Sequence, residues 1–243
     1  MEKIAFVSAA FGGIDSIKPL PAHSGIDTFC YVDEQAYEPA SRETLAAWTR
    51  VIIPNYPRHD FGPRLRSHYF KQQMHRLDEV RSHEWLVWSD SSCRFHDMSF
   101  IPEWVARLEK LPAQKRLLLV PHPERQSVQE EYDAVQTAIA GGSNYLRVRY
   151  ANEKMPEQMD YLRQHNWNAA DSRLWCGTIW MIENSDLLRR CWDDWWDQTL
   201  RFGVMDQLSL PFVLDRHELD PQILDVHLYD NAFWKHEGHL IEA

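Results

Sequence analysis

The chain has 243 residues, of which 36 are acidic and 26 are Lys or Arg, giving a net charge of -10 with 44% hydrophobic residues. This composition excludes an intrinsically disordered chain, and the length allows a large core without disulfides. The acidic balance makes nucleic acid an unlikely partner. No apolar run approaches the roughly 18 residues of a membrane span. The four scattered cysteines exclude a zinc knuckle and indicate buried thiols in a cytoplasmic protein.

Short apolar runs alternate along the chain with longer amphipathic segments, a pattern typical of a mostly parallel sheet covered by helices on both faces. The predicted strands are 4–9, 28–32, 50–53, 85–88, 116–120 and 178–182. The predicted helices are 41–49, 63–79, 102–110, 128–140, 156–165 and 185–202. The predicted fold class is therefore α/β, Rossmann-like, with one domain over residues 1–243.

Four basic residues share one side of the helix predicted at 63–79, namely Arg64, His68, Lys71 and His75. Residues at this spacing lie one above the other on a helix. The spacing leaves two alternatives open, a solvated cationic face or an anion-binding surface.

The segment WLVWSDSS places Asp90 directly after a predicted strand. In open α/β sheets, ligands bind at the carboxyl ends of the strands. A carboxylate there suits a hard cation that holds a diphosphate. The alternative is that Asp90 only caps a turn.

Six segments in chain order carry a resemblance: KIAFVSAAFGG, TFCYVDE, the helix with Arg64 and Lys71, WLVWSDSS, PHPERQSVQEEYD and MDQLSLPFVL. Together they resemble the glycosyltransferase-like domain of the TOD1/MUCI70 family, whose plant members include pectin galacturonosyltransferases. The resemblance implies a GT-A fold, a UDP-sugar donor, a saccharide acceptor, a divalent metal (Mn²⁺ or Mg²⁺) and retention of configuration. The oligomeric state is left open.

The resemblance also implies a donor site, made by Ala9, Phe11, Gly12, Gly13, Asp33, Arg64, Lys71, Asp90 and Ser92. Asp90 matches the first acid of the Asp-x-Asp metal motif, whereas Ser92 replaces the second. A third metal ligand is then expected from the C-terminal histidines, with His236 foremost and His239 and His227 as alternatives. A histidine ligand would favour Mn²⁺ over Mg²⁺. The alternative is an exposed histidine-rich tail.

The catalytic residues that the resemblance implies are Asp206, Gln207, Lys71 and Arg125. Asp206 is expected beside the anomeric carbon, with an N-cap as the alternative. Arg125 is expected to clamp a phosphate or carboxylate, with an ion pair to Glu130 as the alternative. A retaining enzyme lets the leaving phosphate accept the acceptor's proton, whereas an inverting one needs Asp206 or Glu130 as base.

Three tryptophans near predicted strand ends are candidate sugar platforms, namely Trp167, Trp175 and Trp234. Gly177 is expected to leave room for a pyranose. Two other functions remain open: a non-catalytic module that binds nucleotide sugar or carbohydrate, and a glycosyltransferase that modifies bases in DNA. Salt-dependent DNA binding would distinguish the latter.

Overall fold

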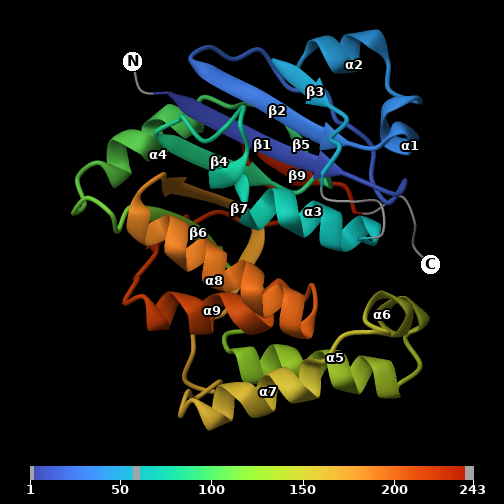
Figure 1. Ribbon diagram of the computed structural model, residues 1–243, viewed down its shortest axis with the longest axis vertical. Helices are drawn as coiled ribbons and strands as arrows, with labels where there is room; N and C mark the ends of the chain where they lie inside the picture. Colours follow the sequence, from blue (N-terminus) through green and yellow to red (C-terminus); the bar gives the residue numbers. More distant parts are fainter. Residues whose placement is uncertain (1–2, 57–60, 239–243) are drawn as a thin grey trace.

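A seven-stranded sheet forms the centre of the computed structural model, which describes residues 3–56 and 61–238 (Figure 1). Its strands are β1 (Ile4–Ala10), β2 (Ile26–Val32), β3 (Arg50–Ile52), β4 (Trp85–Ser89), β6 (Leu117–Pro121), β7 (Trp175–Glu183) and β8 (Gln222–Ile223). Their order is β3-β2-β1-β4-β7-β6-β8. Only β7 runs antiparallel to its neighbours, β4 and β6, so the predicted mostly parallel sheet is confirmed.

Helices cover both faces of the sheet, as predicted. On one face the core includes residues of α3 (Pro63–Gln72), α5 (Val128–Ala140), α7 (Met155–Gln164), α8 (Asp186–Phe202) and α9 (Asp206–Arg216). On the other face lie α1 (Glu34–Tyr37), α2 (Arg42–Ala46) and α4 (Phe100–Leu108). In Figure 1, α3 and α8 lie in front of the sheet and α4 lies behind it.

The strand β1 shows why the sheet needs two covers. Ala5, Val7 and Ala9 belong to one core, and Ile4 and Phe6 belong to the other. Successive side chains of a strand point to opposite faces, so a continuous apolar run is stable only when both faces are buried.

A small second sheet pairs β5 (Cys93–Phe95) with β9 (Trp234–His236) in antiparallel fashion. It anchors the C-terminal segment beside the end of β4. The sequence did not predict it, because each strand has three residues and the two lie far apart in the chain.

The predicted helix at 63–79 is wrong in its second half. The α-helix ends at Gln72, Gln73 leaves the helical conformation (φ -116°, ψ 23°), and a 3₁₀ helix covers Met74–Arg76. The change of direction buries Met74 and His75, which are 0% and 8% exposed. Tertiary burial thus overrides the helical period of the sequence. A further helix, α6 (Asn144–Arg149), forms where we predicted none.

Aromatic and sulfur side chains contribute mainly to the two cores. All four cysteines are buried free thiols, as predicted. Trp175 and Trp234 are 4% and 0% exposed, so their interpretation as sugar platforms is wrong. The indole of Trp167 donates to Asp215 at 2.7 Å and is half-buried.

Within the part of the chain that the structure describes, no helix is both long and apolar enough to cross a membrane.

Candidate active site

A pocket lies where β1 and β4 end. β1 is flanked by β2 on one side and by β4 on the other, so the strand order reverses between them. Such a topological switch point is the usual ligand site of an open α/β sheet. The pocket, which we call the inner pocket, measures about 70 Å³. Its lining residues are Ala9, Phe11, Ile14, Asp15, Pro63, Arg64, Ser67, His68, Asp90, Ser91 and Arg149.

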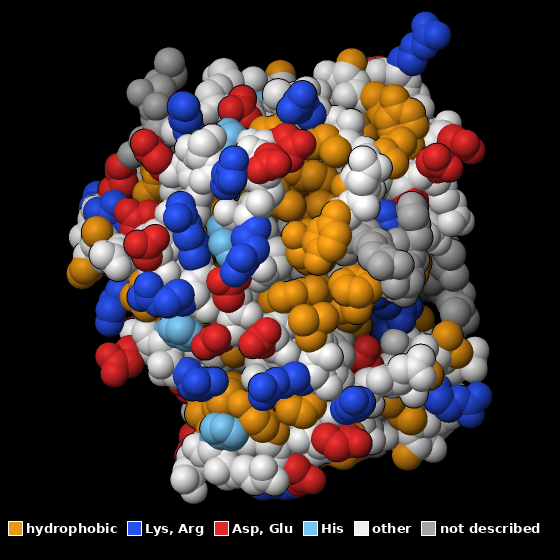
Figure 2. All heavy atoms as spheres, viewed as in Figure 1, with side chains coloured by type: hydrophobic (Ala, Val, Ile, Leu, Met, Phe, Trp, Pro, Cys, Tyr) orange, Lys and Arg blue, Asp and Glu red, His pale blue; other side chains and the backbone are white. Residues whose placement is uncertain are grey.

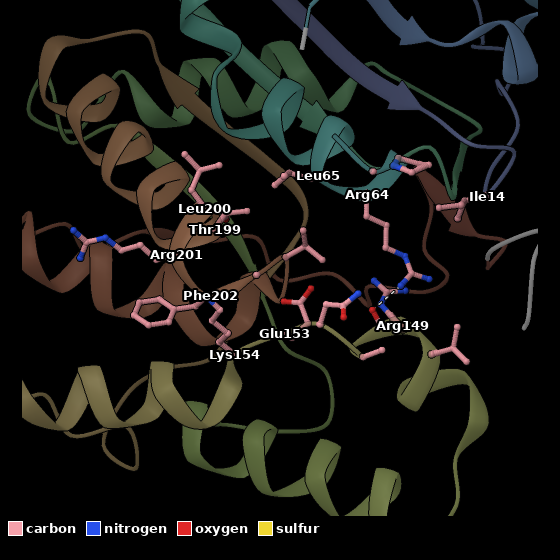
Figure 3. Close-up of a pocket in the computed structure, with 17 residues that line it drawn as sticks. Ile14, Arg64, Leu65, Arg149, Glu153, Lys154, Thr199, Leu200, Arg201 and Phe202 are labelled. Atoms are coloured by element: carbon pink, nitrogen blue, oxygen red, sulfur yellow. Dashed lines mark hydrogen bonds between the residues drawn. The ribbon is translucent and has the colours of Figure 1, made fainter. Parts of the chain in front are cut away.

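A larger cavity of about 590 Å³ adjoins it, and we call this the outer pocket. It lies between α3, the segment from α6 to α7, and the end of α8 (Figure 3). The two share Ile14, Pro63, Arg64 and Arg149. In the space-filling view, Lys or Arg side chains lie set back in a recess to the right of centre (Figure 2). The outer pocket has the size of a small-molecule site, which is about 300–1,000 Å³.

A buried charge cluster lies beside the inner pocket. Lys71 of α3 forms an ion pair with Asp206 of α9, and the two residues are 3% and 7% exposed. Asp206 Oδ1 also lies 3.2 Å from His68 Nε2 and accepts from Gln72 Nε2 at 3.3 Å. Lys71 Nζ lies 3.4 Å from Asp90 Oδ1. The structure therefore brings together Lys71, Asp90 and Asp206, three of the predicted site residues.

The cluster remains charged despite its burial. Burial alone would lower the pKa of Lys71, but the carboxylates of Asp206 and Asp90 outweigh it and hold that pKa above its usual range. Burial alone would raise the pKa of Asp206, but Lys71 and His68 hold it below its usual range. The Lys71 ammonium and the Asp206 carboxylate are thus held together as a charged pair beside the pocket.

The structure decides between the alternative interpretations of the basic helix face, Asp206 and Asp90. The solvated cationic face is wrong, because Lys71 and His75 are 3% and 8% exposed. The N-cap of α9 is Met205, and the carboxylate of Asp206 binds side chains rather than the helix end, so the cap interpretation of Asp206 is also wrong. The turn after β4 is closed by the carbonyl of Asp90, which accepts from Cys93 N at 3.1 Å, not by its carboxylate.

Gly177 of β7 makes room for the charge cluster rather than for a sugar. A Cβ atom at this position would lie 2.7 Å from Asp206 Oδ2 and 2.9 Å from Lys71 Nζ. The expected space for a pyranose at Gly177 is wrong, because the ion pair fills it.

The loop after β1 is held by Asp33. Its Oδ2 accepts from Gly12 N at 2.7 Å, and its Oδ1 accepts from Ala36 N at 3.0 Å as the N-cap of α1. Gly12 and Gly13 have φ of 69° and 65°, a conformation that favours glycine. Asp33 therefore shapes the wall of the site, and its contact with a nucleotide stays a prediction.

A metal site at Asp90, Ser92 and His236 stays a prediction. Asp90 Oδ1 accepts from Trp88 Nε1 at 2.7 Å and contacts Lys71, so this oxygen is already engaged. Ser92 is 1% exposed, and His236 lies on β9, where its Nδ1 accepts from Gly238 N at 3.2 Å. Among residues 3–56 and 61–238, no group of three or more His, Cys, Asp and Glu side chains could hold a metal ion. His239 lies outside the described residues.

Arg125 lies apart, in a cleft of about 610 Å³ at the end of β6. Its guanidinium forms ion pairs with the buried Glu131 and with Glu124, whereas Glu130 accepts from Gln126 N at 2.8 Å. Arg125 thus forms an ion pair, as the alternative predicted, but its partners are Glu131 and Glu124 and not the predicted Glu130. Gln207, the remaining predicted catalytic residue, is half-exposed on the first turn of α9.

Seven residues of the inner pocket were not among the predicted site residues, namely Ile14, Asp15, Pro63, Ser67, His68, Ser91 and Arg149. Ser91 Oγ donates to Asp15 Oδ2 at 2.9 Å, which joins the loop after β1 to the end of β4. Ser91 follows Asp90 directly, so the sequence alone could have placed it at the end of β4. The sequence could not place Arg149 in the pocket, because Arg149 lies 85 residues from its neighbour Arg64 and on a helix that we did not predict.

No protein-family model matches the sequence, and no curated protein matches it. Among solved structures, the apo form of mouse xyloside xylosyltransferase 1 is similar over 92% of this chain and 85% of that chain. The TM-score is 0.49 and the sequence identity is 10%. The resemblance to the TOD1/MUCI70 family stays a prediction.

Proposed function

We propose that the protein is a glycosyltransferase that takes a sugar from a UDP-sugar donor and transfers it to a saccharide acceptor. The observation that carries the proposal is the inner pocket at the switch point between β1 and β4, with Asp90 and the Lys71–Asp206 pair beside it. Glycosyl transfer from a diphosphate needs positive charge at the leaving group and a fixed carboxylate near the developing oxocarbenium ion. Arg64 and Arg149 of the pocket wall supply the positive charge, and Asp206 supplies the carboxylate.

The donor's diphosphate is assigned to the inner pocket, where Arg64 and Arg149 supply cationic groups. Asp15 faces the same space and is suited to accept hydrogen bonds from ribose hydroxyls. The acceptor is assigned to the outer pocket, which opens from the inner one.

We propose that the reaction retains configuration. The bond from the anomeric carbon to the β-phosphate oxygen breaks, and its electron pair goes to that oxygen. The acceptor oxygen then bonds to the anomeric carbon on the same face, and its proton passes to the leaving phosphate. Asp206 is a poor base for this proton, because Lys71 and His68 hold its pKa below the usual range.

The test is release of UDP from a panel of UDP-sugars, with and without saccharide acceptors. Wild type should release UDP, and Asp206→Asn should reduce the rate on the order of a hundredfold. Asp160→Asn, at an exposed carboxylate on α7, is the matched control and should leave the rate unchanged. Tight binding of UDP-sugars without any release would contradict transfer and favour the binding module.

A further inference from the structure

The proposed function, on which this inference rests, requires that the protein hold the donor's diphosphate. A leaving diphosphate needs cationic partners, which a divalent metal commonly provides. Here the predicted protein ligands for such a metal include one carboxylate, that of Asp90, and the buried Ser92. Other cationic groups of this chain would then have to stabilise the leaving diphosphate.

Lys71 already neutralises the carboxylate that would hold a cation. Its ammonium lies 3.4 Å from Asp90 Oδ1, and its pairing with Asp206 fixes it there. The indole of Trp88 donates to the same oxygen at 2.7 Å. A metal ion at Asp90 Oδ1 would have to displace both donors and would lie next to the Lys71 ammonium, which repels it.

Two guanidinium groups converge at the junction of the inner and outer pockets. Arg64 extends from α3 and Arg149 from the end of α6, and Arg64 Nη1 donates to the carbonyl oxygen of Arg149 at 2.7 Å (Figure 3). Both side chains line both pockets. Partial burial and the nearby charge of Arg149 lower the pKa of Arg64. Two like charges in a partly buried pocket are stabilised by an anion, and guanidinium groups match phosphate geometry.

A third basic side chain, His68, lies in the pocket wall and connects Arg64 to Asp206. Its Nδ1 lies 2.8 Å from the carbonyl oxygen of Arg64, and its Nε2 lies 3.2 Å from Asp206 Oδ1.

We propose that the protein binds the donor's diphosphate without a divalent cation, through Arg64 and Arg149, while Lys71 neutralises Asp90 and Asp206. As the glycosyl bond breaks, the guanidinium N–H groups stabilise the charge that develops on the phosphate oxygens. The fixed ammonium of Lys71 keeps the two carboxylates from repelling the diphosphate.

Calorimetric titration with UDP, in EDTA and in Mn²⁺, tests this proposal. Wild type should bind UDP with the same Kd in both. Arg64→Met and Arg149→Met should each raise the Kd on the order of ten- to a hundredfold in EDTA, because each removes a charged hydrogen-bond donor. Arg147→Met, at an exposed arginine on the same helix α6, is the matched control and should leave the Kd unchanged.

Three results would overturn the proposal. UDP binding that requires Mn²⁺ would show that a metal holds the diphosphate, while leaving the proposed function intact. An equal loss of affinity in Arg147→Met would show that general surface charge, not this site, attracts UDP. Absence of UDP binding in both conditions would remove the proposed function as well. Thermal unfolding of each variant separates loss of the site from loss of the fold. Arg64→Lys, which conserves the charge, is a second substitution for the same comparison.

Discussion

The ion pair between Lys71 and Asp206 joins α3 to α9 across 135 residues of sequence, and it lies beside the pocket where β1 and β4 end. A third element, β7, leaves space for it at Gly177. The pair therefore links the stability of the fold to the geometry of the candidate site.

Removing one partner of this pair should destabilise the protein strongly. We expect Lys71→Met to lower the free energy of unfolding by about 3–5 kcal/mol, because it leaves the Asp206 carboxylate buried without its ammonium. The double variant Lys71→Met/Asp206→Leu should lose less than the sum of the two single variants. Urea unfolding measures each value.

The exposed pair Arg163–Asp160 on α7 is the matched control, and Arg163→Ala there should cost less than about 1 kcal/mol. Strictly additive losses at Lys71 and Asp206 would contradict the coupling that the structure shows.

Gly177 should not tolerate a methyl group. The new Cβ of Gly177→Ala would lie 2.7 Å from Asp206 Oδ2, so the ion pair has to shift. We expect a loss of about 1–3 kcal/mol in the free energy of unfolding, as for other overpacked cores. Gly62→Ala serves as the control, since among the described atoms nothing lies within 4 Å of its added Cβ. Equal stabilities for the two variants would contradict the close fit at Gly177.

Asp206 should contribute to the acid limb of the stability profile. Its pKa in the folded state lies below the ordinary value of 3.8, so the stability it contributes is complete above that value. This contribution is lost as the pH falls from 3.8 toward the folded pKa, because the unfolded state then binds the proton more readily. Asp206→Asn should therefore show a shallower loss of stability over this range. Parallel profiles for wild type and variant would contradict the assignment.

The sequence predicted the sheet well and the site only in part. Continuous apolar runs such as Ile4–Ala10 identify buried strands, since local composition decides them. The sequence also identified Asp90, because this residue follows such an apolar run. The partners of Lys71 and Arg64 come from α9 and α6, far along the chain, and no local pattern encodes these contacts. The antiparallel direction of β7 was likewise not readable from its own residues.

Glu153 provides a test of the retaining mechanism. It is a carboxylate of the outer pocket, and burial raises its pKa above the usual range. If the leaving phosphate accepts the proton, Glu153→Gln should keep kcat within about tenfold of wild type and leave the pH profile of kcat/KM unchanged. A loss on the order of 10²–10⁴ in kcat, with the basic limb of the profile abolished, would identify Glu153 as a general base and contradict the phosphate-assisted route.

The central claim is the location of the nucleotide site, and amide hydrogen exchange with and without UDP tests it most directly. The account predicts that UDP slows exchange in the loop after β1, from Phe11 to Asp15, and at Asp90 and Ser91 after β4. Protection confined to the separate cleft around Arg125, or no protection anywhere, would contradict it.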